Sequence, residues 1–248
     1  MCLISFSWQP GTPTPLTMTA NRDEFHARPA LPAQFWKEYP GLLAGQDLEA
    51  GGTWMGVTRQ GRFAALTNVR QMPAPYQGSV SRGNLVKDYL LSTQDPESYL
   101  LGIHQKGLLY DGFNLVVGNR EACWYLSNRI ESGPKCLAPG LYGLSNAQLN
   151  TPWPKVEFAK SALQNWINEP QGDLAGLLSR RDTYPQYQLP DTGIGEPWET
   201  MLSAPFIISP QYGTRAGTGL LITHDLVEFK EITYDQQGNT ASDASYKF

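Results

Sequence analysis

The second residue of the chain is a cysteine, and this position allows a particular chemistry. Removal of Met1, which is common before a small residue, makes Cys2 the first residue, so that it carries both a thiol and an α-amino group. Because an α-amine has a pKa of about 8, it can accept the proton of its own thiol and act as the general base. A chain that retains Met1 lacks this base. The plainer alternative is that Cys2 is a small apolar residue starting a buried strand.

Arg22 and Asp23 are the charged residues that the chain can bring to Cys2. Two β-prone segments, residues 2–8 and 15–20, predict a hairpin. Antiparallel pairing in that hairpin joins residues whose numbers sum to about 24, which places Cys2 opposite Arg22. An arginine near a thiol favours the thiolate, and an aspartate can orient the α-amine or bind the arginine. The alternative is a surface ion pair at a strand end.

Two asparagines and an arginine adjoin other predicted strands. Asn68 and Asn146 directly follow strand patterns, where side-chain amides and backbone N–H groups can form an oxyanion hole. Asparagine is also common in turns for purely structural reasons. Arg215 precedes a strand and can bind a substrate carboxylate or phosphate, with a solvated arginine as the default.

Composition excludes several classes of function. The chain has 248 residues, with 19 basic and 23 acidic side chains and a net charge of −4, and it contains no lysine or arginine run, which argues against nucleic acid as a partner. No apolar run has the length of a membrane span, and the start lacks a signal-peptide layout. The cysteines and histidines have no metal-binding spacing, so neither zinc nor a disulfide framework is indicated. These cysteines and histidines are Cys2, Cys123, Cys136, His26, His104 and His224. We predict a cytoplasmic protein.

The elements that must position these residues alternate between strands and helices. Helices are predicted over 81–91, from the cap at Asp95-Pro96-Glu97, over about 154–167, and over 171–179, with a loop or lid over 182–201. Further strands are predicted at 53–58, 62–68, 113–118, 122–127, 141–145, 205–209, 218–223 and 226–234. This order favours an α+β fold with helix-covered sheets, in a single domain over residues 1–248.

Several short motifs, taken together in their order and spacing, resemble the NRDE family, whose animal member is known as transport and Golgi organisation protein 2. The matching segments are Met1-Cys2-Leu3-Ile4, Asn21-Arg22-Asp23-Glu24, Arg28-Pro29, Gly45-Gln46-Asp47, Gly51-Gly52-Thr53-Trp54-Met55-Gly56, Thr67-Asn68-Val69-Arg70, Ser81-Arg82-Gly83, Tyr142-Gly143-Leu144-Ser145-Asn146 and Tyr212-Gly213-Thr214-Arg215. They span nearly the whole chain.

The resemblance implies an N-terminal-nucleophile hydrolase-like fold, a four-layer αββα sandwich of two stacked antiparallel sheets flanked by helices. It also looks, more distantly, like the cysteine acylases that cleave penicillin V and conjugated bile acids. That likeness implies four catalytic residues, which are Cys2, Arg22, Asp23 and Asn146. The predicted substrate-binding residues are Asn21, Asn68, Arg70 and Arg215.

Two functions from different classes fit these residues. The leading hypothesis is a cytoplasmic amidohydrolase-like protein in which Cys2 attacks a non-peptide amide or thioester, with no cofactor required and a small molecule as partner. The alternative is a carrier that holds haem or an acyl-CoA in the same cleft without turnover. In that case Arg22, Arg70 or Arg215 pairs with propionates or phosphates, and Cys2 or a histidine ligates the iron. The sequence does not predict an oligomeric state.

Overall fold

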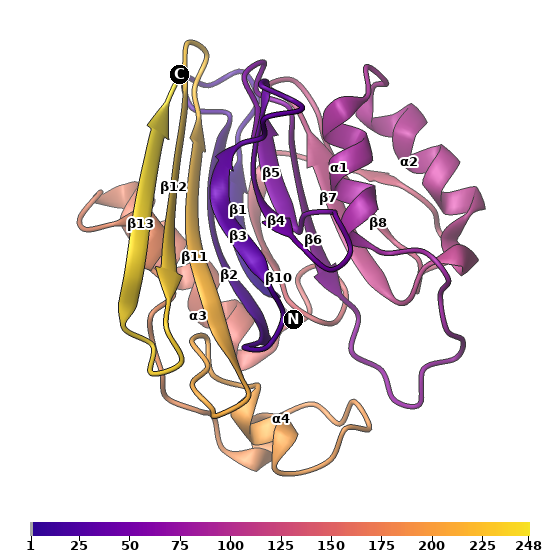
Figure 1. Ribbon diagram of the computed structural model, residues 1–248, viewed down its shortest axis with the longest axis vertical. Helices are drawn as coiled ribbons and strands as arrows, with labels where there is room; N and C mark the ends of the chain where they lie inside the picture. Colours follow the sequence, from indigo (N-terminus) through magenta and orange to yellow (C-terminus); the bar gives the residue numbers. More distant parts are fainter. Residues whose placement is uncertain (1) are drawn as a thin grey trace.

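The computed structural model describes residues 2–248, which form two antiparallel sheets stacked face to face (Figure 1). The six-stranded sheet has the spatial order β10 (Gly140–Leu144), β1 (Cys2–Trp8), β2 (Leu16–Phe25), β11 (Tyr212–Ile222), β12 (Val227–Tyr234) and β13 (Thr240–Lys247). The seven-stranded sheet has the order β3 (Ala30–Phe35), β4 (Leu42–Asp47), β5 (Met55–Thr58), β6 (Phe63–Asn68), β7 (Phe113–Gly118), β8 (Cys123–Ser127) and β9 (Lys135–Cys136).

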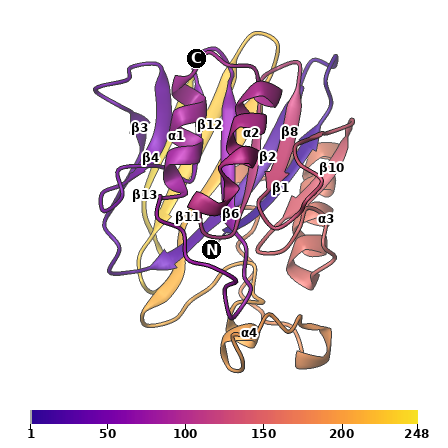
Figure 2. The ribbon, with the colours of Figure 1, turned by 90° about the vertical axis from the view of Figure 1, so that its right-hand side faces the viewer.

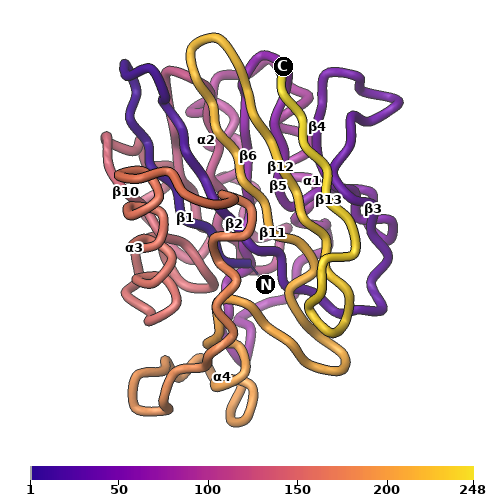
Figure 3. Tube along the Cα trace, turned by 90° about the vertical axis from the view of Figure 1, so that its left-hand side faces the viewer, coloured from indigo at the N-terminus to yellow at the C-terminus, as the bar shows by residue number. Residues whose placement is uncertain are grey.

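Helices lie on the outer faces of both sheets. The helices α1 (Gly83–Leu91) and α2 (Pro96–Gln105) lie in front of the seven-stranded sheet in the view of Figure 2. On the six-stranded sheet, α3 (Pro154–Asn168) packs over β1 and β10, as the opposite view shows (Figure 3). The predicted αββα layering is therefore confirmed. The remaining helical segments are short: α4 (Trp198–Met201) and the 3-10 turns η1 (Gly107–Leu109), η2 (Leu174–Gly176) and η3 (Gln186–Gln188).

The core follows from the alternation of side chains along each strand. In β1, Ile4, Phe6 and Trp8 belong to the apolar cluster that lies between the sheets. Leu3 points the other way and packs with Val156 of α3. Both faces of β1 are thus buried, which fixes the orientation of the N-terminal strand and, with it, the face on which Cys2 lies.

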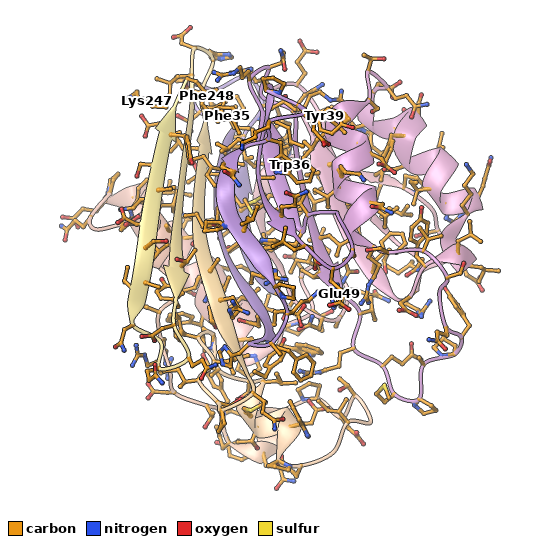
Figure 4. The ribbon with its side chains drawn as sticks, in the orientation of Figure 1. Phe35, Trp36, Tyr39, Glu49, Lys247 and Phe248 are labelled. Atoms are coloured by element: carbon orange, nitrogen blue, oxygen red, sulfur yellow. The ribbon has the colours of Figure 1, made fainter. Side chains whose placement is uncertain are left out.

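Aromatic side chains close one end of the stack. Phe35 in β3 and Phe248 lie close together (Figure 4), with ring centres 5.2 Å apart. The ring of Tyr246 lies 5.7 Å from that of Phe35. The guanidinium of Arg59 covers Phe35 at 4.0 Å from the ring centre. Strand β1 begins at the opposite end of the sheets (Figure 1). These aromatic side chains therefore do not occupy the end at which Cys2 lies.

The predicted N-terminal hairpin is confirmed with its register. Strands β1 and β2 pair so that Cys2 lies opposite Arg22, and Trp8 lies opposite Leu16. The second predicted hairpin also forms, as β5 and β6, with Gly61 at a φ of +79° in the turn.

Other elements differ from the sequence prediction. Strands β3, β4, β9 and β13 were not predicted. In β13, most residues are exposed and polar, so no apolar alternation marks the strand. The strand predicted at 205–209 is wrong, because that segment forms only an isolated bridge from Ile208 to Gly213. The helix predicted over 171–179 is also wrong, since only the 3-10 turn η2 forms there.

The segment over 182–201, predicted as a loop or lid, contains η3 and α4. Although much of it is exposed, Glu199 is buried. Across residues 2–248, no helix combines the length and the apolar character that crossing a bilayer requires.

Candidate functional site

A cleft of about 770 Å³ opens between the two sheets at the end where β1 begins. Its lining comes from β2, β11 and β12 on one side and from β3, β4 and the segment 78–83 on the other. The volume lies within the range of small-molecule sites, roughly 300–1,000 Å³. Cys2, Arg22, Asp23, Asn68 and Arg215 all line this cleft, so the structure brings together five of the eight predicted site residues.

Cys2 starts β1 and is only 6% exposed. Its carbonyl oxygen accepts a hydrogen bond of 3.1 Å from the Ser145 hydroxyl, which anchors the strand end to the segment after β10. Burial raises the pKa of the Cys2 thiol to about 11, because the thiolate loses its hydration. Near neutral pH the group is therefore a thiol, and any attack by the sulfur needs a base to remove its proton.

Arg22 and Asp23 follow each other on β2, so their side chains point to opposite faces of the strand. The Arg22 guanidinium lies 3.7 Å from the Glu24 carboxylate and 3.8 Å from that of Asp47. On the other face, the Asp23 carboxylate accepts a 2.7 Å hydrogen bond from the Thr214 hydroxyl. Burial raises the pKa of Asp23 above its usual value. The two residues therefore cannot pair with each other as in the surface ion pair considered above.

Asn68 and Asn146 are hydrogen-bonded to each other, but they line two different cavities. Asn146 is fully buried, and its Nδ2 donates a 2.9 Å hydrogen bond to the Asn68 carbonyl oxygen. Its Oδ1 accepts from the Ser145 hydroxyl. Asn68 lines the main cleft, whereas Asn146 lines a second cavity of about 620 Å³. Among residues 2–248, the Asn68 amide makes no side-chain hydrogen bond, so it can bind a ligand.

Two of the predicted ligand-binding residues lie outside the main cleft. Asn21 is buried, and its Nδ2 donates to the carbonyl oxygens of Leu178 and Pro205, each at 2.9 Å. Arg70 lines the second cavity, where it forms a buried ion pair of 2.8 Å with Glu199. Both side chains thus tie segments of the fold together.

Arg215 does lie in the main cleft. Its Nη1 donates to the backbone carbonyl oxygens of Phe25, His26 and Arg28 at 3.1–3.4 Å. No carboxylate oxygen among the described residues lies within ion-pair distance of it, so the guanidinium remains able to bind an anion.

Sequence reasoning assigned no role to three buried or half-buried charged residues near the site. Arg82 and Glu231 line the main cleft, and Lys155 of α3 lies on the outer side of the six-stranded sheet. The Lys155 ammonium donates to the Leu202 carbonyl oxygen at 2.9 Å, and burial lowers its pKa to about 8. Asp23 opposes this shift. Only Arg82 had a sequence signal, because it belongs to one of the motifs quoted above.

Glu231 spans the gap between the sheets. From β12 of the six-stranded sheet, its Oε1 accepts a 2.6 Å hydrogen bond from the Ala33 N–H in β3 of the other sheet. Burial raises the pKa of Glu231 to about 7, an effect opposed by that hydrogen bond and by Arg22. Within residues 2–248, no group of three or more His, Cys, Asp or Glu side chains is arranged to hold a metal ion.

The cleft wall depends on a close approach of two glycine-containing loops. A Cβ on Gly52 would lie 2.5 Å from the carbonyl carbon of Gly83, which is far closer than atoms tolerate. The Thr53 N–H also donates to the Gly83 carbonyl oxygen at 3.2 Å. The glycine at position 52 therefore lets the two motifs pack together.

We expect Gly52→Ala to lower the free energy of unfolding by about 1–3 kcal/mol, because the 81–83 segment must move away from its neighbour. Chemical denaturation measures the change. Gly102→Ala in α2 is the matched control, since nothing lies within 4 Å of its added Cβ and helix propensity favours alanine. Equal stabilities of Gly52→Ala and the parent protein would contradict the close approach.

Sequence comparison finds close similarity over most of the chain. The family model described as Transport and Golgi organisation 2 matches residues 1–236. The Transport and Golgi organization protein 2 homolog of Bos taurus is 37% identical, over 98% of this chain and 95% of the relative. The Homo sapiens homolog is 36% identical, over 99% of this chain and 96% of the relative. Transport and Golgi organization protein 2 of Drosophila melanogaster is 31% identical over 66% of this chain and 64% of the relative.

Among solved structures, the similarity is more distant. A Caenorhabditis elegans ortholog of N-acylethanolamine-hydrolyzing acid amidase covers 88% of this chain, and 92% of its own length, at 10% identity and a TM-score of 0.42. A mutant conjugated bile acid hydrolase from Clostridium perfringens covers 99% of this chain, and 97% of its own length, at 8% identity and a TM-score of 0.42.

Proposed function

The chain belongs to the Transport and Golgi organisation 2 family, and from this premise we propose that it hydrolyses a small-molecule amide or thioester with Cys2 as the nucleophile. The observation that supports this proposal most is the placement of Cys2, which lines the 770 Å³ cleft directly opposite Arg22. A thiol used only for packing has no need to face a polar cleft.

The reaction needs a base, because burial keeps the Cys2 thiol protonated. Removal of Met1 supplies one, since the new α-amine has a pKa of about 8 and lies on the same residue as the sulfur. Asp23, adjacent to the residue opposite Cys2, orients this amine, and Arg22 stabilises negative charge on the sulfur as the proton leaves.

The proposed steps are those of acyl transfer. The amine takes the thiol proton while the sulfur bonds to the carbonyl carbon, which gives a tetrahedral oxyanion. Collapse of this species breaks the C–N or C–S bond, and the amine returns the proton to the leaving group. Water then attacks the remaining acyl thioester with the same amine as base, which releases the acid and restores the thiol.

The oxyanion binds at Asn68 in this proposal. Its amide faces the cleft and makes no side-chain hydrogen bond within residues 2–248, while Asn146 fixes the Asn68 backbone through the 2.9 Å bond. Donors held in place before reaction stabilise developing charge without reorganisation. Asn146 thus acts mainly by placing Asn68.

The test compares two forms of the protein that differ at the N-terminus. One carries Met1, and the other has Cys2 exposed by an aminopeptidase, with both masses verified. Each is screened against chromogenic acyl amides and acyl thioesters, with Cys2→Ala as the control. We expect turnover only in the processed form, at least about 100-fold above the other two. Equal turnover by Cys2→Ala, or retention of Met1 in the native host, would overturn the proposal.

A second candidate function is a carrier that holds haem or an acyl-CoA in the same cleft. The arginines of the cleft favour it, because propionates and phosphates are anions that guanidinium groups bind well. No histidine among residues 2–248 lines this cleft, so of the iron ligands predicted from the sequence, Cys2 lies there. Titration with haem and with an acyl-CoA distinguishes the two functions, because a carrier binds one of these ligands without converting it. The Cys2→Ala variant of a haem carrier loses haem binding, whereas that of an acyl-CoA carrier retains acyl-CoA binding.

A further inference from the structure

The Ser81-Arg82-Gly83 motif has no role in the proposed chemistry, yet it forms part of the cleft wall. Arg82 directly precedes α1, and the loop that bears it is held by the close contact between Gly52 and Gly83. Arg82 therefore enters the cleft from the seven-stranded side, whereas Arg22 and Arg215 enter from the six-stranded side.

The guanidinium of Arg82 is held by a carbonyl group. Its Nη1 donates to the Gly112 carbonyl oxygen at 3.0 Å. Among residues 2–248, no carboxylate oxygen lies within 4.0 Å of it; Asp111 and Glu24 are electrostatic neighbours beyond that distance. Arginine stays protonated in proteins, so a charged donor with unused N–H groups faces the cleft. Cys2 is also an electrostatic neighbour of this group.

Three acidic side chains of the cleft accept hydrogen bonds from within the protein, whereas Arg82 uses one of its five N–H groups, in the bond to Gly112. Asp47 accepts a 2.6 Å hydrogen bond from Arg28, Asp111 accepts from the Gly78 N–H at 2.8 Å, and Glu231 accepts from a backbone N–H. Arg82 therefore keeps N–H donors that no other residue among 2–248 uses, and these donors are available to an anionic ligand.

We propose that Arg82 binds an oxyanion of the ligand, a carboxylate or a phosphate, next to the bond that Cys2 attacks. The inference rests on the proposed function only in taking the Cys2 cleft as the ligand site. It narrows the ligand to an acyl compound that carries a negative charge near its reactive carbonyl. A bidentate guanidinium contact fixes both the position and the orientation of such a group.

The test uses two alkylating reagents of similar size and different charge. Iodoacetate is an anion and iodoacetamide is neutral, and both react with the Cys2 thiolate, so the ratio of their rates cancels any change in the pKa of the thiol. Cys136 is exposed and serves as the internal reference in each digest. We expect Arg82→Met to lower the iodoacetate-to-iodoacetamide ratio at Cys2 by about fivefold, and Arg82→Lys to retain most of it.

Arg120→Met is the matched control. Arg120 is likewise held by carbonyl oxygens, those of Thr223 and Gln60, but it lies outside the cleft. The control should leave the ratio unchanged. The same ratio in Arg82→Met and the parent would overturn the proposal. If Arg82→Met does not fold, the iodoacetate-to-iodoacetamide ratio of the parent protein must still fall as ionic strength rises, because salt screens the guanidinium. A ratio that does not depend on salt would also overturn the proposal.

Protection of Cys2 assigns the anion. Sodium phosphate and sodium propionate, at matched ionic strength, should differ in how far they slow iodoacetamide, and the stronger protector identifies the oxyanion class. Protection by neither, or equal protection in Arg82→Met, contradicts binding at Arg82. None of these readouts requires turnover, so a failure of Cys2→Ala to abolish hydrolysis would leave the ratio and the protection interpretable.

Discussion

Glu199→Gln is expected to lower the free energy of unfolding by about 3–5 kcal/mol, because it removes one partner of a buried ion pair. The side chains of Arg70 and Glu199 are only 5% and 7% exposed, and their charged atoms lie 2.8 Å apart. The other oxygen of Glu199 accepts from the Thr192 N–H at 2.7 Å. The neutral amide keeps the shape of the side chain but removes the negative charge that lies 2.8 Å from the buried Arg70 guanidinium.

Urea unfolding at neutral pH measures this loss. Glu157→Gln is the matched control, since Glu157 pairs with Lys160 at 3.3 Å on the exposed side of α3. A surface pair contributes about 0–1 kcal/mol, so the control should hardly change the midpoint. A similar small change for Glu199→Gln would show that the pair does not anchor the 182–201 segment to the body of the protein.

Glu231→Gln is expected to stabilise the protein at alkaline pH and to leave it unchanged in acid. The pKa of Glu231 rises from 4.5 to about 7 on folding. The folded state therefore binds a proton that the unfolded state has lost between these values, and the free energy of unfolding falls as the pH rises through this window. Above pH 7, the ionised side chain remains buried at a cost of up to about 3 kcal/mol.

The difference between the parent protein and Glu231→Gln isolates this effect, because other titrating groups contribute equally to both. Glutamine keeps the acceptor for the Ala33 N–H, so only the charge changes. We expect unfolding midpoints that coincide near pH 4.5 and diverge in favour of the variant by pH 8. Glu228→Gln, on the exposed side of the same strand, should show no such divergence. A constant difference across the pH range would mean that Glu231 titrates as an ordinary exposed acid.

The local part of the site could be predicted from the sequence. Cys2 and Arg22 belong to one hairpin, whose register depends only on strand patterning and loop position, and both were placed correctly. The order of strands and helices predicted an α+β fold with helix-covered sheets, and the family resemblance implied the stack of two antiparallel sheets that the structure shows.

The remainder depends on contacts between distant segments. Lys155 looks like a solvated lysine on a helix, and it becomes buried only because Leu202 and the chain around α4 cover it. Glu231 occupies an ordinary strand position, and its partner Ala33 lies almost two hundred residues earlier in the chain. Asn21 is the reverse case, because its motif predicted ligand binding. In the structure its amide instead donates to two backbone carbonyl oxygens from later segments.

The N-terminal hairpin also constrains when the removal of Met1 that the proposed function requires can take place. Strands β1 and β2 come before the other described elements in chain order, and a hairpin of this kind forms within about 1–10 μs. The strands that complete the sheet around them, β10 and β11, are synthesised more than one hundred residues later. Because the finished fold buries Cys2 and Leu3, an aminopeptidase reaches the chain end most readily while the protein is still being translated. The removal of Met1 that the proposed function requires is thus expected during translation, in competition with folding of the sheet.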